Sequence, residues 1–291
     1  MVPRGSCCPA LPYFYEVNKT LLSTLLPVPL HIDKGNIEDF VFVSAAGPRH
    51  REEITVLVES IQTHFPTVKL VIYDLGMSEA QHQTMLTWCN VDVRTLDFEK
   101  YPPHIKILHS YAFKPLVIAE VLKGYDVSGV FWVDASIRFK VGDISLLHYI
   151  VLRNKGVCAF PGATHSVFAV TPREMFQFLP MVKNPKKEEC LMSGLILLYK
   201  TKHVIDRILR WWVACALSQT CMYSLPQRFC TFTNDRWNDF ANCSRYDQSA
   251  LSIILYNAFP NSSEAFAPVL LSGAIYIQRG GTGGKVKSCN L

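Results

Sequence analysis

The side chains best suited to chemistry follow the apolar segment “FWV” at residues 131–133. Asp134 comes directly after this segment, and Ser136 provides a hydroxyl group two positions later. Asp134 has two interpretations: it is half of a metal-binding Asp-x-Asp pair, or it is the polar cap of a buried strand. The first interpretation predicts an enzyme site, and the second predicts an α/β domain without such a site.

The elements that must position Asp134 alternate between apolar strands and amphipathic helices from about residue 36 onward. Short apolar runs predict strands, and apolar residues three or four apart predict helices. Strands are expected at 40–47, 68–76 and 91–97 and from 129 to a carboxyl end at Asp134, and helices at 51–65, 78–89 (with Ser78 as N-cap) and 110–124. This series predicts an α/β fold with a mostly parallel, Rossmann-type sheet that is covered by helices on both faces.

Ligands of such sheets bind outside the carboxyl ends of the strands, where the strand order reverses. Three predicted strand ends supply small or acidic groups to that edge, namely Ala45–Ala46, Asp74 and Asp134. Asp74 either contacts a ligand or caps the turn that follows it. The segment Ser44–Arg49 contains a single glycine, which argues against the glycine-rich turn of dinucleotide and methyl-donor enzymes.

Two further polar pairs begin later elements. Ser193-Gly194 opens the apolar strand predicted at 192–199, where the glycine marks either a bend or a close approach of a ligand to the backbone. Asp247-Gln248 opens the helix predicted at 247–259, and Asp247 is a natural N-cap for its first turn.

Composition indicates a globular protein with a sizeable core. The chain has 291 residues, 49% of them hydrophobic and 18% charged. Its formal charge of +5 is spread along the chain and lacks the basic stripe that binds nucleic acid, so we expect no nucleic-acid partner. The apolar run “RILRWWVACAL” at 207–217 has helical spacing that favours core packing over carbohydrate stacking.

Cysteine usage favours an oxidising compartment. Five of the ten cysteines lie between Cys190 and Cys243 at spacings that match no zinc pattern, so at least one disulfide is expected there. Glycosylation sequons at Asn18, Asn242 and Asn261 agree with a secretory lumen, either Golgi or extracellular, while a cytoplasmic location stays open. The N-terminus shows no signal-peptide pattern or long apolar run, so no membrane anchor is expected in this chain.

Five blocks carry a resemblance to a known family: “VSAAGPRH”, “VIYDLG”, “YAFKPLVIAEVL”, “FWVDASIRF” and “YDQSAL”. They resemble an animal family, abundant in nematodes, that has no assigned activity and is associated with the nucleotide-diphospho-sugar transferase (GT-A) fold. The resemblance covers residues from about 38 to 256. It implies a GT-A-like domain at 37–260 with a cysteine-bearing loop at 218–244, an N-terminal extension or stem at 1–36, and a C-terminal tail at 261–291.

The order of elements is more distantly similar to retaining glycosyltransferases of the glycogenin and bacterial lipopolysaccharide galactosyltransferase type. In that type an Asp-x-Asp strand precedes a Ser-Gly strand and an Asp-Gln pair. The same order here reads Asp134-Ala135-Ser136, Ser193-Gly194 and Asp247-Gln248. The resemblance therefore implies that Asp247 and Gln248 are catalytic. It further implies a donor site that is lined by Ala45, Ala46, Asp74, Lys114, Ser193 and Gly194.

The resemblance also implies a divalent cation, Mn²⁺ or Mg²⁺, held by Asp134 and Ser136. Hard carboxylate oxygens suit such ions, which neutralise the charge that grows on a leaving diphosphate. The sequence departs from the family pattern here, because Ser136 replaces a second aspartate and no histidine follows His203. Arg279 and Lys285 in the segment “IQRGGTGGKVK” are alternative groups for holding phosphate directly.

The reading that follows is a glycosyltransferase that moves a sugar from a nucleotide-sugar donor, UDP-linked in the expected case, to an unknown glycan, protein or lipid acceptor. Two alternatives stay open. One is a non-catalytic relative that binds a nucleotide or a glycan, and the other is an interaction protein with no active site.

Overall fold

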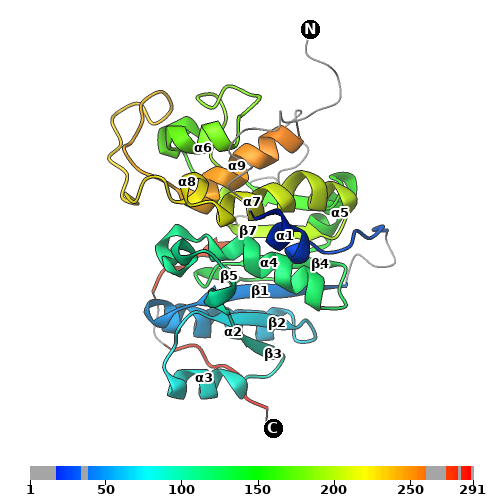
Figure 1. The fold of residues 1–291 in the computed structure, drawn as a ribbon. Helices are drawn as coiled ribbons and strands as arrows, with labels where there is room; N and C mark the ends of the chain where they lie inside the picture. Colours follow the sequence, from blue (N-terminus) through cyan, green and yellow to red (C-terminus); the bar gives the residue numbers. More distant parts are fainter. Residues whose placement is uncertain (1–17, 34–38, 260–272, 281–282, 290–291) are drawn as a thin grey trace.

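A computed structural model describes residues 18–33, 39–259, 273–280 and 283–289, and its centre is a mixed sheet with helices on both sides (Figure 1). Six strands of the described part form this sheet in the order β3-β2-β1-β4-β7-β6. Their bounds are Phe40–Ala46 (β1), Leu70–Asp74 (β2), Val91–Thr95 (β3), Gly129–Val133 (β4), Val157–Phe160 (β6) and Met192–Tyr199 (β7). Strands β3, β2, β1 and β4 are parallel, whereas β7 is antiparallel to both of its neighbours. The predicted α/β fold with a mostly parallel sheet is confirmed.

The helices follow the predicted alternation along the first half of the chain. The α-helices are Lys19–Leu25 (α1), Arg51–His64 (α2), Glu79–Leu86 (α3), Phe113–Gly124 (α4), Ser145–Arg153 (α5), Arg173–Phe178 (α6), Arg210–Leu217 (α7), Gln219–Met222 (α8) and Tyr246–Ala258 (α9). Short 3₁₀ helices span Pro48–His50, Phe98–Lys100, Pro103–Lys106, Leu108–Ser110 and Phe168–Val170, and a π-helical turn, Val204–Leu209, leads into α7. Ser78 caps α3 in a capping box, as predicted.

Alternate residues of each central strand point to opposite faces of the sheet, and each face buries its own hydrophobic core. Val43 and Trp132 pack on the face that α1, α4, α7 and α9 cover. Phe42 and Phe131 pack on the opposite face, against α2 and α5. Asp134 continues the alternation of Trp132, so its side chain is directed toward the face of α4.

The strand order reverses between β1 and β4. The chain winds outward from β1 through β2 to β3, and then returns to place β4 on the other side of β1. Ala45–Ala46 and Asp134 follow the last paired residues of these two strands, Val43 and Trp132. They therefore lie at the edge of the sheet where ligands of doubly wound folds bind.

The strand predicted to end at Asp134 is β4, and a second short strand follows it. The amide of Ile137 donates to the carbonyl of Asp134 (2.9 Å), and this turn ends β4 before a short strand β5, Ile137–Phe139, begins. β5 leaves the central sheet and pairs antiparallel with β8, Ile275–Ile277, from the predicted C-terminal tail. The turn at Asp134–Ser136 is thus held by a second small sheet.

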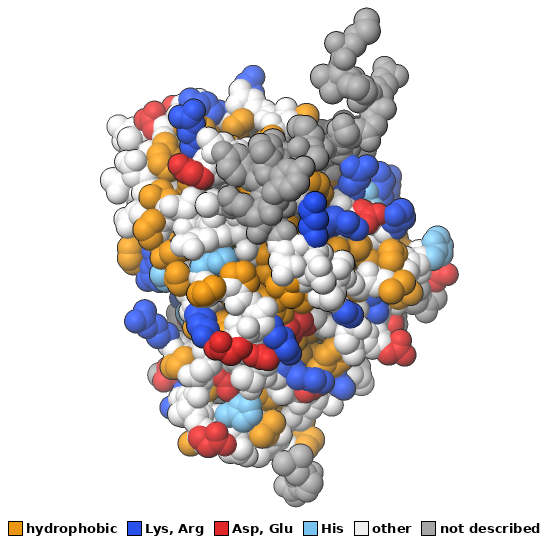
Figure 2. Space-filling view, viewed as in Figure 1, with side chains coloured by type: hydrophobic (Ala, Val, Ile, Leu, Met, Phe, Trp, Pro, Cys, Tyr) orange, Lys and Arg blue, Asp and Glu red, His pale blue; other side chains and the backbone are white. Residues whose placement is uncertain are grey.

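Three disulfides join cysteines of the described residues. Cys215–Cys221 and Cys230–Cys243 confirm the disulfide prediction for 190–243. The third, Cys89–Cys289, links positions 200 residues apart. The sequon at Asn261 lies outside the described residues, and within them no helix has the length and apolar character to span a bilayer. On the face shown in Figure 2, basic and acidic side chains lie interspersed.

Candidate active site

A buried lysine occupies the centre of the candidate site. The side chain of Lys114 is 1% exposed. Its ammonium lies 2.7 Å from Asp247 Oδ2 and 3.2 Å from Asp134 Oδ1. It also donates to the carbonyl of Ser193 (3.0 Å) and approaches the Ser193 hydroxyl at 3.4 Å. Helices α4 and α9 and strand β7 therefore meet the end of β4 at one ammonium group.

The local sequence explains why Lys114 points inward. Pro115 is the third residue of α4, in the first turn, where the missing N–H has no helical partner to lose. The rest of α4 is almost wholly apolar and packs on the sheet, which fixes the first turn against β4. The ammonium lies 5.3 Å from the Trp132 ring and 5.4 Å from the Tyr111 ring, within the range of cation–π attraction.

Asp134 is oriented by its neighbours on β4 and β7. The indole N–H of Trp132 donates to Asp134 Oδ1 at 2.7 Å, and the Asp134 amide donates to the carbonyl of Gly194 at 2.8 Å. A Cβ atom on Gly194 would lie 2.8 Å from Asp134 Oδ2, so this position tolerates only glycine without displacement of the carboxylate. Asp134 remains 33% exposed and is the part of the cluster that a ligand can reach.

Asp247 is the most buried carboxylate of the cluster, with a side chain that is 4% exposed. Burial raises the pKa of Asp247, and the charge of Asp134 adds to this, while the Lys114 ammonium opposes it. Burial alone would lower the pKa of Lys114, but the two carboxylates outweigh it and hold that pKa above its usual value.

The prediction that Asp247 caps α9 is wrong. The helix begins at Tyr246, the preceding residue Arg245 makes no side-chain cap, and the Ser244 hydroxyl accepts from the Tyr246 amide at 3.1 Å. Asp247 instead turns inward because Lys114 provides a buried opposite charge, which outweighs what one capping bond would contribute.

Two tyrosines beside the cluster hold a left-handed backbone that bulky residues rarely adopt. Tyr111 has φ +54° and remains 38% exposed, and Tyr246 has φ +44°. The Tyr246 hydroxyl donates to the carbonyl of Pro226 (2.8 Å), and its ring stacks on Tyr223. Strained residues of this kind concentrate at functional sites. Sequence analysis missed both tyrosines, because no sequence pattern predicts the sign of φ in a tyrosine.

Trp132 was missed as well, although its signal was present in the sequence. It stands two residues before Asp134 on a strand, so both side chains point to the same face. An indole N–H that shares a face with a strand-end carboxylate is a natural partner for it.

The other predicted site residues stand at the edge of this cluster. Asp74 accepts from the amides of Gly76 and Met77 through Oδ1, and its Oδ2 lies 2.7 Å from His82 Nδ1, so it serves its own turn and α3. Gln248 is half-buried in the first turn of α9 beside Asp247.

Ala45 and Ala46 end β1, where the carbonyl of Ala46 accepts from the Leu75 amide at 3.0 Å. This bond holds the start of the turn after β2 against the end of β1. Ala45 packs on the α4 face of the sheet, on which the cluster lies, whereas the Ala46 side chain is buried in the core on the α2 face and does not face the cluster.

The residues predicted to hold a divalent cation do not fit one. Asp134 Oδ1 is already engaged by Trp132 and Lys114, and Ser136 adds a neutral hydroxyl in place of a carboxylate. Nowhere in the described ranges do three or more His, Cys, Asp or Glu residues form a group that could hold a metal ion. The ammonium of Lys114 supplies the positive charge between the two aspartates, where a cation would be repelled.

Comparisons with known proteins found one family model and several similar solved structures. A family described as a protein of unknown function (DUF1647) matches residues 23–119, and no curated protein matches. Similar solved structures include the galactosyltransferase LgtC in complex with donor and acceptor sugar analogues (16% identity, TM-score 0.42, 75% of this chain and 70% of that one). They also include the bifunctional glycosyltransferase WbbM (16%, 0.44, 77% and 45%) and the glycosyltransferase GlyE of Streptococcus pneumoniae TIGR4 (13%, 0.43, 82% and 46%). This chain thus spans under half of WbbM and GlyE, and all three are at most 16% identical to it, so the function proposed below rests on the site geometry.

Proposed function

We propose that the chain is a GT-A-like glycosyltransferase that transfers a sugar from a nucleotide-sugar donor, UDP-linked, to a glycan, protein or lipid acceptor. One observation carries the proposal: a buried ammonium is held between two aspartates at the switch-point edge of the sheet. Maintaining three charges there costs stability, and groups of this kind are typical of active sites.

The charge balance of the cluster suits glycosyl transfer. Two carboxylates and one ammonium sum to −1 when all are ionised. Breaking the bond between the sugar and the diphosphate builds positive charge on the anomeric carbon, and a fixed negative site stabilises that charge. Asp247 is the residue we assign to this role, and the amide oxygen of the adjacent Gln248 is assigned to the same sugar.

The reaction needs no separate base. The bond from the anomeric carbon to the diphosphate oxygen breaks with its electron pair, and the nucleoside diphosphate leaves. The acceptor hydroxyl then forms the new bond from the same side of the sugar, and its proton passes to the diphosphate oxygen. The anomeric configuration is therefore retained, which NMR of the product reads directly.

The substitution Asp247→Asn tests this assignment. It preserves shape and leaves Lys114 paired with Asp134, but removes the charge near the sugar. Turnover, measured as release of UDP from a UDP-sugar, should fall by about 10² or more while UDP affinity changes little. Unchanged turnover, or an inverted product, would contradict the role of Asp247.

A non-catalytic nucleotide- or glycan-binding protein is the second candidate, and Ser136 favours it because this position lacks a carboxylate. A thermal-shift screen of UDP-sugars separates the two, since any ligand of the native state raises the melting temperature by mass action. An enzyme should also release UDP from the stabilising donor over time, whereas a binder should not.

The compartment we propose is the secretory lumen. Disulfides persist in oxidising compartments, and the sequon asparagines Asn18 and Asn242 are exposed. When the chain is expressed behind a signal peptide, glycosidase treatment should lower its apparent mass. An unchanged mass together with free thiols throughout would place it in the cytoplasm.

A further inference from the structure

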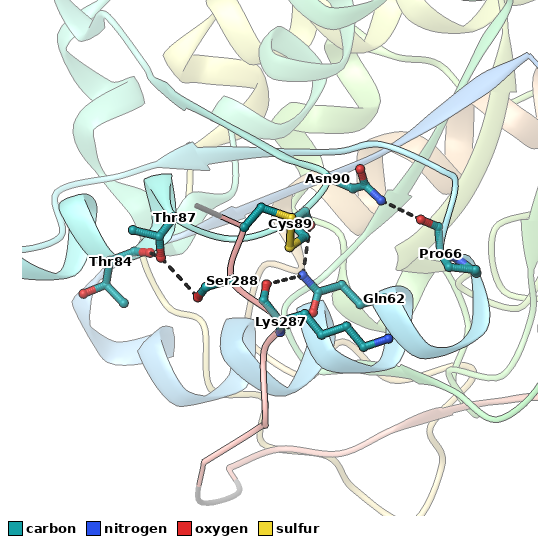
Figure 3. Close-up of a disulfide and its surroundings, with 9 residues drawn as sticks. Gln62, Pro66, Thr84, Thr87, Cys89, Asn90, Lys287 and Ser288 are labelled. Atoms are coloured by element: carbon teal, nitrogen blue, oxygen red, sulfur yellow. Dashed lines mark hydrogen bonds between the residues drawn. A yellow bond between two sulfur atoms is a disulfide. The ribbon is translucent and has the colours of Figure 1, made fainter. Parts of the chain in front are cut away.

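The C-terminal part of the chain forms a strap, by which we mean residues 275–280 and 283–289. Figure 1 shows it in red beside α2 and α3. At its far end the disulfide Cys89–Cys289 and the side chain of Gln62 hold it in place (Figure 3). The Gln62 amide group donates to the carbonyls of Cys89 (2.9 Å) and Lys287 (3.0 Å) and accepts from the Lys287 amide (2.7 Å).

The middle of the strap lies directly on α2. A Cβ atom on Gly284 would lie 2.8 Å from the carbonyl oxygen of Thr55 and 2.9 Å from Val56 Cα, so the backbones are in contact. Lys285 follows on this stretch and is exposed, away from the strand ends. The strap is therefore docked along the helix from the site edge to the opposite edge of the sheet.

The near end of the strap reaches the candidate site. β8 pairs with β5, and the amide of Gln278 donates to the carbonyl of Ser136 at 2.8 Å. Two residues on, the amide of Gly280 donates to Glu53 Oε1 at 2.8 Å, and Glu53 Oε2 lies 2.7 Å from His50 Nδ1. The strap thus contacts both the turn after Asp134 and a carboxylate at the start of α2.

Arg138 contacts the backbone of the same turn. Its side chain is buried, and its Nη1 donates to the carbonyls of Ala135 (2.6 Å) and Ile137 (2.7 Å). Its Nε and Nη2 are buried without a hydrogen-bond partner among the described residues.

We propose that Arg138 and Glu53 are positioning residues and that the docked strap, pinned by Cys89–Cys289, orders the turn that carries Asp134. Glu53 docks the amide of Gly280, the amide of Gln278 then holds the carbonyl of Ser136, and Arg138 holds the carbonyl of Ala135. This inference deepens the proposed function, on which its consequence for ligand binding rests. The ordering of the turn at Asp134–Ser136 by the strap does not depend on that function.

Hydrogen exchange of the full chain, read by mass spectrometry, tests the inference. Cys289→Ser frees the far end of the strap, and amides of residues 134–139 should then exchange about tenfold faster or more. Glu53→Ala removes the acceptor for the Gly280 amide at the near end of the strap, so it should accelerate the same amides while residues 285–289 stay protected. Lys285→Ala, an exposed change within the strap, is the matched control and should alter neither region.

Unchanged exchange at 134–139 in both Cys289→Ser and Glu53→Ala would overturn the inference. Should Cys289→Ser fail to fold, Glu53→Ala decides it alone. With UDP as the probe, both variants should also bind about tenfold more weakly than the parent, and the melting temperature of Glu53→Ala should stay close to that of the parent. A parent that binds no UDP contradicts the proposed function only, whereas faster exchange with unaltered UDP affinity contradicts the positioning role.

Discussion

At the scale of single residues, the cluster depends on one lysine that never reaches water. Removing a charge of this kind from solvent costs several kcal/mol unless opposite charges and hydrogen bonds surround it. Asp134, Asp247 and the carbonyl of Ser193 meet that need for Lys114. These partners therefore stabilise the folded chain, and they are also candidate site residues.

Lys114→Met should lower the free energy of unfolding by about 3–5 kcal/mol, because it leaves Asp247 as a buried carboxylate without its counter-charge. Adding Asp247→Leu to this variant should recover a large part of the loss, which denaturant unfolding measures. Lys202→Met is the matched control, since Lys202 pairs with Asp206 at an exposed helix position and should cost at most about 1 kcal/mol. Equal losses in the two single variants would contradict the assigned role of Lys114.

Sequence analysis identified Asp134, Lys114, Ser193 and Asp247 because each stands at the start or end of a predicted element. It could not identify the ion pairs between them. Asp247 illustrates the reason: its local sequence favours a helix cap, and only the packing of α4 against α9 brings a competing ammonium within 2.7 Å. The capping preference of Asp247 contributes less free energy than its buried ion pair with Lys114.

At the scale of elements, the site depends on how closely β7 approaches the end of β4. Val133 pairs with Leu195, and the next contact along the strands is the bond from the Asp134 amide to the Gly194 carbonyl. This close approach leaves no room for a side chain at Gly194, which explains a glycine inside an otherwise bulky strand.

Gly194→Ala should displace the Asp134 carboxylate and weaken UDP binding by about tenfold or more, measured by titration calorimetry. Gly124→Ala at the end of α4 is the control, because no atom lies within 4 Å of the added Cβ. We expect this control to keep full affinity and to gain slightly in stability. Equal affinities of the two variants would show that the contact between β7 and Asp134 has no part in binding.

The strands and helices from β1 to α4 were predicted well, since each has a clear apolar period and a turn signal, whereas α1 was not predicted. The strand that leads to Asp134 ends there as expected, but the short strand β5 after it was not predicted. The partner of β5 is β8, which lies more than 130 residues later in the chain. No local sequence pattern predicts a pairing at that distance. The direction of β7 was equally hidden, since apolar content is the same in parallel and antiparallel core strands.

At the scale of the whole molecule, several histidines are buried in neutral form. Burial lowers the pKa values of His104, His165 and His203 below the ordinary value, in the last case to about 4. The unfolded chain then binds more protons than the folded chain between about pH 6.5 and 4. Stability therefore decreases as the pH falls through this range.

His203 alone should reduce the free energy of unfolding by about 1 kcal/mol between pH 7 and pH 5, after allowance for its partial exposure. Denaturant unfolding at the two pH values measures this. His203→Gln should flatten the dependence. A parent whose stability rises toward pH 5 would contradict the buried neutral state of these histidines.

The whole-molecule topology was predicted only in part. Alternation of strands and helices indicated a parallel sheet, but the order β3-β2-β1-β4-β7-β6 and the disulfide across 200 residues depend on contacts between distant segments. The division into an extension at 1–36, a domain at 37–260 and a tail at 261–291 stays a prediction. The described part of the tail packs on α2 and β5.

Titration calorimetry with a UDP-sugar, comparing the parent with Asp134→Asn, tests the central claim most directly. The asparagine keeps the acceptor for the Trp132 indole and the shape of the strand end, but removes the one partly exposed carboxylate of the cluster. We predict that the parent binds the UDP-sugar and that Asp134→Asn binds it at least about tenfold more weakly, because a carboxylate accepts stronger hydrogen bonds from sugar hydroxyls than an amide oxygen does. A parent that binds neither UDP nor a UDP-sugar, or an Asp134→Asn variant with undiminished affinity, would contradict a nucleotide-sugar site at Lys114, Asp134 and Asp247.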